Sequence, residues 1–435
     1  MTESTVVAST ETGTAVASGV QTPLAARVEA LYPELFAFFA DLHCHPEVGH
    51  HEFRTTDRIA EALVGTGFEV RRPEGATGLV AVLRNGEGPV VALRADIDAL
   101  PIREASGVPY ASESASDAGG AGLGGETRAP AMHACGHDFN TTALLAAARL
   151  LSDDLDAWSG TVVLLAQPAE ELGNGARRIR DTGVLEGLPR PDVVLGQHTG
   201  GRPPALFTSR PGTYMAAVRA WNITARGPGG HGSVPHLTVN PLLFAAQLVS
   251  RLHAIPATVL STEERAVVVP TVVRGGTEAN IIPDEVTITV AARAFDTEVL
   301  DRIEHEILRV TEGLAAAEGV TELVIDQHRT FPLNVNDPDA LDAAVQSLEA
   351  EFGAGSYAEI PAILGAEDFG EFATYWGAAS AYWHFDAGVS PDAAHPEEAR
   401  RGHSPTFAPD PEVGLRRGAR ALTAVALRFL GPGAG

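Results

Sequence analysis

Residues 141–171 read TTALLAAARLLSDDLDAWSGTVVLLAQPAEE, and this stretch sets the expected fold. Its first eleven residues repeat apolar side chains at helical spacing, which predicts a helix over 141–151. The mostly apolar run at 161–166 lacks the alternation of a half-exposed strand, so we expect a strand that is buried on both faces. A buried strand that follows a helix indicates an α/β sheet with parallel strands.

The same alternation continues on both sides of this stretch. Further helices are expected over 24–41, 55–66, 339–352 and 412–430, and further strands over 78–83, 89–94 and 192–196. We therefore expect an α/β fold with a mixed sheet, in a larger domain formed by residues 23–213 and 328–435. Residues 1–22 are expected to be a disordered tail, and the Gly-, Ala- and Ser-rich segment 112–130 a loop.

A second pattern occupies residues 214–327. Strands are expected over 217–225, 266–274, 285–294 and 321–327, with helices over 241–253 and 297–318. This β-α-β-β-α-β order is the ferredoxin-like arrangement. We expect a small α+β domain inserted in the larger one.

Composition excludes several classes of function. The formal net charge of −25 disfavours nucleic acid and anionic membranes as partners, since both need basic surface. The chain contains no lysine, which excludes Schiff-base and P-loop chemistry. Two cysteines make no disulfide framework. No apolar run approaches the roughly 18 residues of a membrane span, and residues 1–20 lack a basic region, so we expect a cytoplasmic protein.

The segment MHACGHD at 132–138 is the densest group of metal-ligating residue types. Thiolate and imidazole ligands such as Cys135 and His137 suit Zn²⁺ and other late first-row metals. A turn before a helix also favours the thiolate that a metal needs. The alternative is a structural cysteine beside a loop histidine.

Other candidate ligands follow predicted strands, where sites form in open α/β sheets. Glu170 and Glu171, in QPAEE, could divide metal binding and proton transfer between them, or could simply begin a solvated helix. His198 follows the strand 192–196, and His403 lies in the loop segment RGHSPTF. This set of ligands suits two metal ions that share a bridging ligand.

The glycine-rich segment GPGGHGSVPH at 227–236 lies in the expected small domain. It lacks the spacing and the lysine of a phosphate-binding loop. His231 could be brought over the metals by domain closure and stabilise an oxyanion there. The alternative is a hairpin with an exposed histidine.

Together these motifs resemble the M20 family of metallopeptidases. MHACGHD, QPAEE, GQH, GPGGHGSVPH, NIIPDEV, GAEDF and HSPTF occur in the order found in its aminoacylase and carboxypeptidase branch. That branch includes hippurate hydrolases, plant auxin-conjugate amidohydrolases and N-acetyl-diaminopimelate deacetylases. The resemblance covers about residues 24–430.

The resemblance implies a dinuclear metallopeptidase-type catalytic domain, a lid domain at 214–327 and a homodimer formed through the lid. It also implies two divalent ions per subunit, Zn²⁺, Mn²⁺, Co²⁺ or Ni²⁺. The residue roles that it implies are metal ligation by Cys135 as the bridging ligand, His137, Glu171, His198 and His403, general base catalysis by Glu170, carbonyl polarisation by His231, and substrate binding by Asn280 and His236.

The activity that the resemblance implies is hydrolysis of the amide bond of N-acyl amino acids, with Glu170 activating metal-bound water. A dipeptidase or carboxypeptidase on the same scaffold is the first alternative. A non-catalytic binding protein is the second, and the intact ligand set argues against it.

The chain departs from the family pattern at two places. Asn140 stands where the branch usually has a second histidine after the HD pair. Arg94, in RADID, stands where other branches supply a ligand, so Asp96 and Asp98 are expected to support the metal ligands or the fold. The loop 112–130 is longer than usual and is expected to shape the mouth of the pocket.

Overall fold

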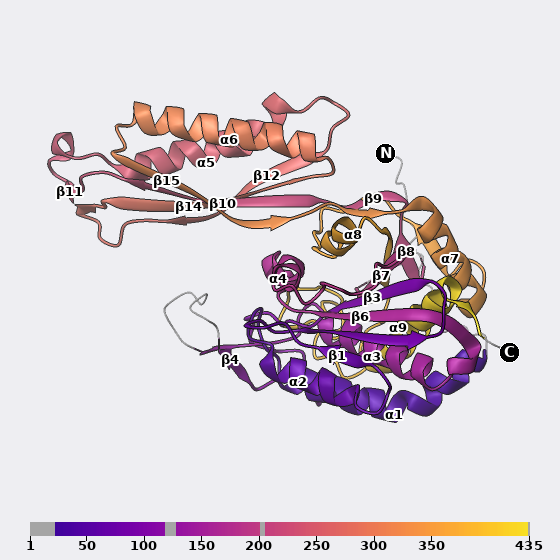
Figure 1. Cartoon of the computed structure of the whole chain (residues 1–435). Helices are drawn as coiled ribbons and strands as arrows, with labels where there is room; N and C mark the ends of the chain where they lie inside the picture. The colour runs from indigo at the N-terminus through magenta and orange to yellow at the C-terminus, as the bar shows by residue number, and fades with distance from the viewer. Residues whose placement is uncertain (1–21, 118–127, 201–204, 434–435) are drawn as a thin grey trace, which may run out of the picture.

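The computed structural model of the chain describes residues 22–117, 128–200 and 205–433. Its larger part is built on a mixed sheet with the strand order β1-β2-β6-β3-β7-β18-β8-β17, while β19 pairs with β6 (Figure 1). The strands are β1 (Glu69–Arg71), β2 (Leu79–Asn85), β3 (Val90–Asp96), β6 (Trp158–Gln167), β7 (Val193–Thr199), β8 (Phe207–Ser209), β17 (Tyr357–Glu359), β18 (Ala379–Phe385) and β19 (Gly431–Pro432). The central strands β6, β3, β7 and β18 are parallel to one another.

Helices cover both faces of this sheet. One face carries α1 (Pro23–Cys44), α2 (Phe53–Ala62), α3 (His137–Ser152), α7 (Pro338–Phe352) and α9 (Pro411–Phe429). The other face carries α4 (Gly175–Asp181) and α8 (Gly370–Trp376), which pack on it through residues such as Ile179 and Phe372. The expected α/β fold with a mixed sheet is confirmed.

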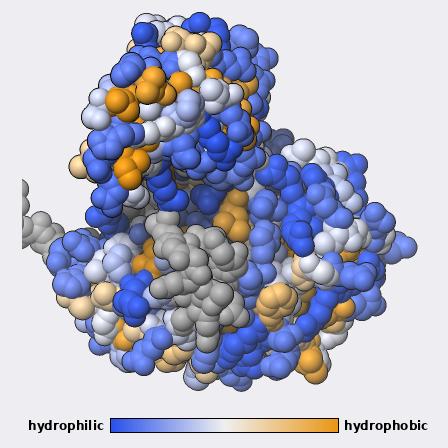
Figure 2. All heavy atoms as spheres, turned by 90° about the vertical axis from the view of Figure 1, so that its left-hand side faces the viewer, coloured by the Kyte–Doolittle hydropathy of each residue, from blue (hydrophilic) through white to orange (hydrophobic). Residues whose placement is uncertain are grey.

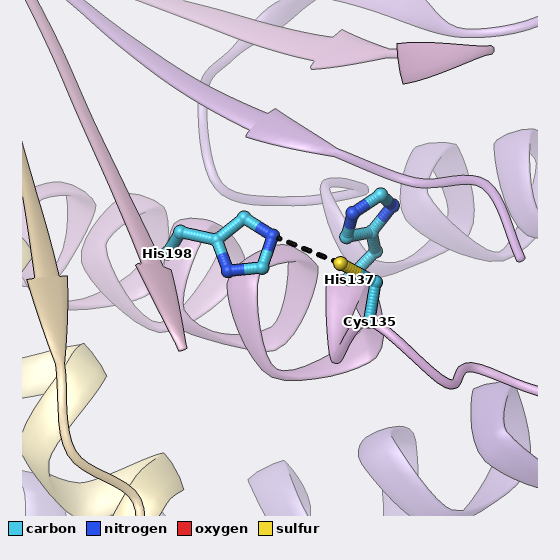
Figure 3. A group of neighbouring side chains, drawn as sticks. All are labelled: Cys135, His137 and His198. Carbon is cyan, nitrogen blue, oxygen red and sulfur yellow. Dashed lines mark hydrogen bonds between the residues drawn. The ribbon is translucent and has the colours of Figure 1, made fainter. Parts of the chain in front are cut away.

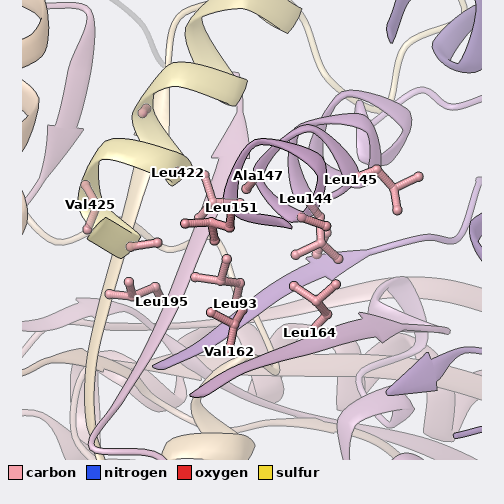
Figure 4. Close-up of a cluster of buried hydrophobic side chains, with 14 of the residues drawn as sticks. Leu93, Leu144, Leu145, Ala147, Leu151, Val162, Leu164, Leu195, Leu422 and Val425 are labelled. Atoms are coloured by element: carbon pink, nitrogen blue, oxygen red, sulfur yellow. The ribbon is translucent and has the colours of Figure 1, made fainter. Parts of the chain in front are cut away.

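The main hydrophobic core lies between the sheet, α3 and α9. Figure 4 shows Leu144 and Leu151 of α3 above Leu93 and Val162 of the strands, with Leu422 of α9 alongside. Nearly every side chain of α3 is buried. Burial of apolar area contributes about 25 cal/mol per Å², so this packing holds α3 firmly against the sheet. The first residue of α3, His137, lies at the edge of the sheet.

The smaller part is a four-stranded antiparallel sheet with the order β12-β14-β10-β15. Its strands are β10 (Ala217–Arg226), β12 (Ala266–Arg274), β14 (Glu285–Ala294) and β15 (Glu322–Phe331), and one face carries α5 (Pro241–Val259) and α6 (Thr297–Ala317). The predicted β-α-β-β-α-β succession is therefore present.

By length and composition alone, α5 is the one helix of the described chain that could cross a membrane. Such a helix is weak support for a membrane span. In this structure its apolar residues Phe244, Leu248 and Leu252 are buried against the small sheet.

Two short strands connect the parts. β9 (Gly212–Met215) leads into the small sheet and β16 (Asn334–Asn336) leads out of it, and the two pair with each other antiparallel. The space-filling view shows two lobes with a recess between them (Figure 2).

Several element boundaries differ from the predictions. α3 begins at His137 rather than at residue 141, and β15 extends to Phe331. The segment 112–130 was expected to be only a loop, but β4 (Ala115–Asp117) and β5 (Arg128–Pro130) pair within it. Residues 118–127 of that loop, and residues 1–21 of the expected tail, lie outside the described residues.

Candidate metal centre

Polar side chains gather where the parallel strands β3, β6, β7 and β18 end. Parallel strands place their carboxyl ends at one edge of the sheet, and ligand sites form at such edges. Glu170 and Glu171 follow β6, and His198 lies near the end of β7. Cys135 and His137 reach the same edge from the start of α3.

A tight turn places Cys135 in this group. Gly136 has a φ of 84°, and a Cβ there would lie 2.1 Å from Thr199 Cγ2, so only glycine fits. The turn points the Cys135 thiol toward β7, where its Sγ lies 3.6 Å from His198 Nε2. Figure 3 shows this contact, with the His137 ring beside it.

His137 is fully buried and oriented by a carboxylate. Its Nδ1 lies 3.1 Å from Asp98 Oδ1. Its Nε2 is buried without a hydrogen-bond partner, although Glu170 Oε2 lies 3.9 Å away and Glu171 Oε1 lies 4.0 Å away. A buried ring nitrogen that faces carboxylates without bonding to them suits a metal ligand, whose other nitrogen is usually held by a carboxylate.

The turn after β6 places both glutamates beside His137. Ala169 adopts a left-handed conformation with a φ of 50°, and Glu170 and Glu171 follow in the short 3-10 helix η2 (Glu170–Leu172). The Ala169 amide donates to the buried carboxylate of Glu52 at 2.7 Å. The Glu171 amide donates to Asp98 Oδ2 at 3.0 Å, so two buried carboxylates fix this turn.

His403 completes the group from the C-terminal part of the chain. Its Nε2 lies 3.1 Å from Glu171 Oε1, and its amide donates to the Ala134 carbonyl. Its side chain is 54% exposed, and its φ of 58° is left-handed. It is therefore the most accessible of the candidate ligands.

The candidate ligand atoms form overlapping groups; one joins His137 to Glu170 and Glu171, and two contain Cys135. Cys135 lies with His137 and His198 in one group and with Glu171 and His403 in another, and within each group the ligand atoms lie within 4.8 Å of one another. A thiolate that belongs to both groups can bridge two metal ions. The unpartnered His137 Nε2 and the donor set of sulfur, imidazole and carboxylate fit late divalent metals.

The charges around Cys135 favour its thiolate. Burial and the Glu171 carboxylate raise the pKa of the Cys135 thiol, but His198 and His137 outweigh them and lower it to about 6. Burial, and next the neighbouring Glu367, hold the pKa of Glu170 well above its usual range. Such opposed shifts within one cleft are typical of catalytic sites.

Behind the centre lies a buried ionic network around Arg94. Its guanidinium makes two hydrogen bonds to Glu367, of 2.7 and 3.2 Å, and one of 2.8 Å to Asp96. The Tyr382 hydroxyl donates to Glu367 at 2.6 Å. Arg94 thus neutralises carboxylates beside Glu170. The motif GAEDF contained Glu367, but the sequence offered no partner for it.

The Asn140 side chain forms hydrogen bonds to the last residues of β3 and β7. Its Nδ2 donates to Asp96 Oδ1 at 2.8 Å, and its Oδ1 accepts from the Thr199 amide at 2.9 Å. A neutral amide thus supplies the donor and the acceptor that this position needs. Asp98 contacts two of the candidate ligands, His137 through its ring nitrogen Nδ1 and Glu171 through its amide.

The candidate residues of the small lobe stand apart from this centre. His231 is exposed in β11 (Gly230–His231), which pairs with β13 (Ile281–Ile282), and the Asn280 carbonyl accepts from the Gly232 amide. His236 is exposed in the 3-10 helix η3 (Pro235–Leu237). Within the described residues, no hydrogen bond or ion pair joins these three side chains to the metal-centre residues.

His384 is a residue at this edge that the sequence interpretation missed. It lies in β18 as the register partner of His198, and their ring centroids are 5.7 Å apart. Burial, and next the neighbouring His198, lower the pKa of His384 to about 3. The available signal was the position of His384 near the end of the strand-like run ASAYWHF. His198 was identified because it lies at the corresponding position of its own strand.

Comparisons with known proteins agree with this architecture. Residues 92–427 match the model of peptidase family M20/M25/M40. An N-acetyl-L-cysteine deacetylase of Bacillus subtilis is 35% identical over 334 residues, 72% of this chain and 76% of that protein. Thermostable carboxypeptidase 2 of Saccharolobus solfataricus is 34% identical over 336 residues, 76% of this chain and 80% of that protein.

A solved structure extends the comparison to the fold. A Bacillus subtilis protein described as a dinuclear metal-binding peptidase superposes with a TM-score of 0.68 and 28% identity, over 92% of this chain and all of that one. The family match, the relatives and the shared architecture lead to one conclusion. The chain belongs to peptidase family M20/M25/M40.

Proposed function

We propose that the protein hydrolyses the amide bond of N-acyl amino acids with the help of two divalent metal ions. The observation that carries the proposal is the position of Cys135 in both ligand groups, with Glu170 beside them. Relatives named deacetylase and carboxypeptidase support amide hydrolysis as the reaction class.

The candidate residues have separate proposed roles in metal binding and in proton transfer. Cys135, His137, Glu171, His198 and His403 would hold the ions. Zn²⁺, Mn²⁺, Co²⁺ or Ni²⁺ bound there would supply Lewis acidity toward the scissile carbonyl. Glu170 takes a proton from the attacking water and gives it to the leaving nitrogen. Its raised pKa suits it to hold the proton between these two steps.

We further propose that the small lobe acts as a lid and that two chains form a homodimer through it. Residues 214–327 would form this lid, and residues 23–213 with 328–435 the catalytic domain. His231 would polarise the substrate carbonyl of a partner's site, with Asn280 and His236 contacting the substrate. Their exposure supports this arrangement, because exposed side chains remain available to a second chain.

The edge of the small sheet supports the dimer. β12 pairs with β14 on one side only, and Val269 and Val273 on it are 44% and 52% exposed. An unpaired edge strand with exposed valines can pair with a second chain.

A second candidate function is peptide cleavage by a carboxypeptidase on the same scaffold, because one relative carries that name. The two differ only in the substrate that the cleft accepts. A hydrolysis screen over N-acetyl and N-benzoyl amino acids and free dipeptides, with each metal added in turn, separates them. Cleavage of dipeptides alone would favour the second function.

The role of Glu170 is tested by a matched pair of variants. We expect Glu170→Gln to lower kcat by roughly 10²- to 10⁴-fold, the range for a general base, with two metal ions per subunit retained. Glu171→Gln should instead lose metal. Metal loss in the first variant, or full turnover, would contradict the division of roles.

A further inference from the structure

The short helix η2, which carries the two glutamates of the metal centre, is anchored at three points. At its start the Ala169 amide donates to Glu52, and in its middle the Glu171 amide donates to Asp98. Both acceptors belong to the large lobe, which contains the mixed sheet. The third anchor is at Gly173, where η2 ends, and it involves the small lobe.

Gly173 packs directly against the last residues of β15. Its amide donates to the Glu170 carbonyl at 2.7 Å, and its φ of 70° is left-handed. A Cβ at this position would lie 2.7 Å from Phe331 Cε2 and 2.8 Å from the Thr330 carbonyl oxygen. Side-chain carbons do not approach other atoms so closely, so a glycine is needed for η2 and β15 to touch.

Arg177 of α4 connects the same two segments by hydrogen bonds. Its Nη2 lies 2.8 Å from the Gly173 carbonyl oxygen, 3.0 Å from the Thr330 carbonyl oxygen and 2.8 Å from the Thr330 hydroxyl. The Nε of the same guanidinium lies 3.7 Å from Glu371 Oε1 in α8. A planar guanidinium presents its donors in a fixed geometry, so Arg177 holds the end of η2 and β15 in one arrangement.

This connection crosses from one lobe to the other. Arg177 and Gly173 belong to the large lobe, whereas Thr330 is the register partner of Arg219 in the small sheet. A shift of β15 therefore either strains the connection or breaks it. Both outcomes change what holds the end of η2, and Gly173 lies only two residues after Glu171.

We propose that Arg177 is a positioning residue that couples the orientation of Glu170 and Glu171 to the place of the small lobe. This inference rests on the proposed function, in which Glu170 transfers protons and Glu171 holds metal. It adds to that function a route by which the small lobe acts on the metal centre of its own chain.

Arg177→Met removes the connection and keeps much of the apolar part of the side chain. We expect kcat to fall about 10- to 100-fold, because a small misplacement of a catalytic group has an effect of this size. KM should change little, since the proposed role is to place Glu170 rather than to bind substrate. Arg178→Met is the matched control and should keep the wild-type kcat, because the neighbouring Arg178 donates to the Gly75 carbonyl instead.

Thr330→Val tests the small-lobe side of the connection. It removes the hydroxyl acceptor and keeps the shape of the side chain, so kcat should fall, though by less than in Arg177→Met. In the Arg177→Met background the same substitution should have no further effect, and independent effects of the two substitutions would overturn the coupling. Arg177→Lys retains a cation with three donors and should recover part of kcat.

Bound Co²⁺ gives a measurement that needs no turnover. The visible absorption of Co²⁺ depends on the arrangement of its ligands, and Glu171 is a proposed ligand. We expect the spectrum of Co²⁺-loaded Arg177→Met to differ from the wild type and that of Arg178→Met to match it. If Arg177→Met does not fold, Thr330→Val takes its place in both measurements.

The two kinds of measurement separate this inference from the proposed function. A changed Co²⁺ spectrum supports the role of Arg177 even if no amide is cleaved, in which case only the proposed function fails. A spectrum that matches the wild type overturns the inference, and so does an equal loss of kcat in Arg178→Met.

Discussion

Asn140 shows how one side chain can preserve a site while departing from a family pattern. It holds Asp96 and the Thr199 amide with one donor and one acceptor. The histidine that the branch usually has at this position also offers one donor and one acceptor when it is neutral. The departure therefore changes the residue type and keeps the connection between β3 and β7.

Replacement of Asn140 by leucine should weaken the metal centre. The Thr199 amide would lose its partner, at a cost of about 1–3 kcal/mol in the free energy of unfolding. Metal affinity should fall about 10- to 100-fold, the usual effect of losing a group that orients ligands. Metal titration and urea unfolding measure both. Asn140→His is the control and should retain most of the affinity.

The surroundings of His43 predict that the free energy of unfolding of the protein depends on pH. It is buried with its Nδ1 2.6 Å from Asp138 and its Nε2 3.1 Å from Glu104. Burial would lower the pKa of His43, but these carboxylates outweigh it and raise the pKa to about 10. The folded state thus holds a proton that the unfolded chain releases near pH 6.5.

The stabilisation from His43 is therefore fully present below about pH 6.5 and is lost as the pH rises toward 10. The difference in unfolding free energy between wild type and His43→Gln should shrink by a few kcal/mol, to order of magnitude, over that range. Urea unfolding at several pH values measures it.

At the scale of elements, the turn between β6 and α4 depends on a residue far away in sequence. Glu52, at the start of α2, is fully buried and accepts from the Ala169 amide and the Thr77 hydroxyl. These bonds hold the left-handed Ala169 and thereby position Glu170 and Glu171, whose carboxylates both lie near His137 Nε2.

Glu52→Leu should cost about 1–3 kcal/mol for each donor left unpaired. It should also lower kcat, because the aim of Glu170 depends on the turn. Glu52→Gln keeps an acceptor and should recover most of both. Thermal unfolding and steady-state kinetics make the comparison. A stability loss with unchanged kcat would limit Glu52 to a structural role.

Elements with strong patterns were predictable from the sequence. The strands 266–274 and 285–294 coincide with β12 and β14, because apolar runs or alternation mark them clearly. The N-terminus of α3 was placed four residues late, since His137 and Asp138 are polar in sequence but buried in the structure. The meeting of Glu170, Glu171 and His198 at one edge of the sheet was predictable from their positions near strand ends. The pairing of Arg94 with Glu367 spans 273 residues and left no local signal.

At the scale of the whole molecule, the proposed exchange of His231 between subunits predicts complementation. Glu170→Ala lacks the base and His231→Ala lacks the lid histidine, so each should be inactive alone. A mixed dimer would contain one site with both residues. Mixing and reassociating the two variants should restore about a quarter of wild-type activity, since half of the dimers are mixed and each has one intact site of two.

The control for complementation is a variant that should not form the dimer. Val269→Lys combined with Val273→Lys places charges on the exposed edge of β12 and should give monomers in light scattering. These monomers should keep their metal and lose activity. Restored activity in a monomeric mixture, or no recovery in a dimeric one, would contradict exchange of His231.

The paired strands β9 and β16 give the molecule a mechanical property. The chain enters and leaves the small lobe through one ribbon, which continues into the pairing of β10 with β15. A two-stranded ribbon bends readily across its face, but its hydrogen bonds resist sliding of one strand along the other. If the small lobe moves as the proposed lid, bending of this ribbon is the expected motion. That motion would also have to break the bonds from Arg177 to Thr330 and from Arg293 to the Leu364 carbonyl, which join the two lobes beside the ribbon.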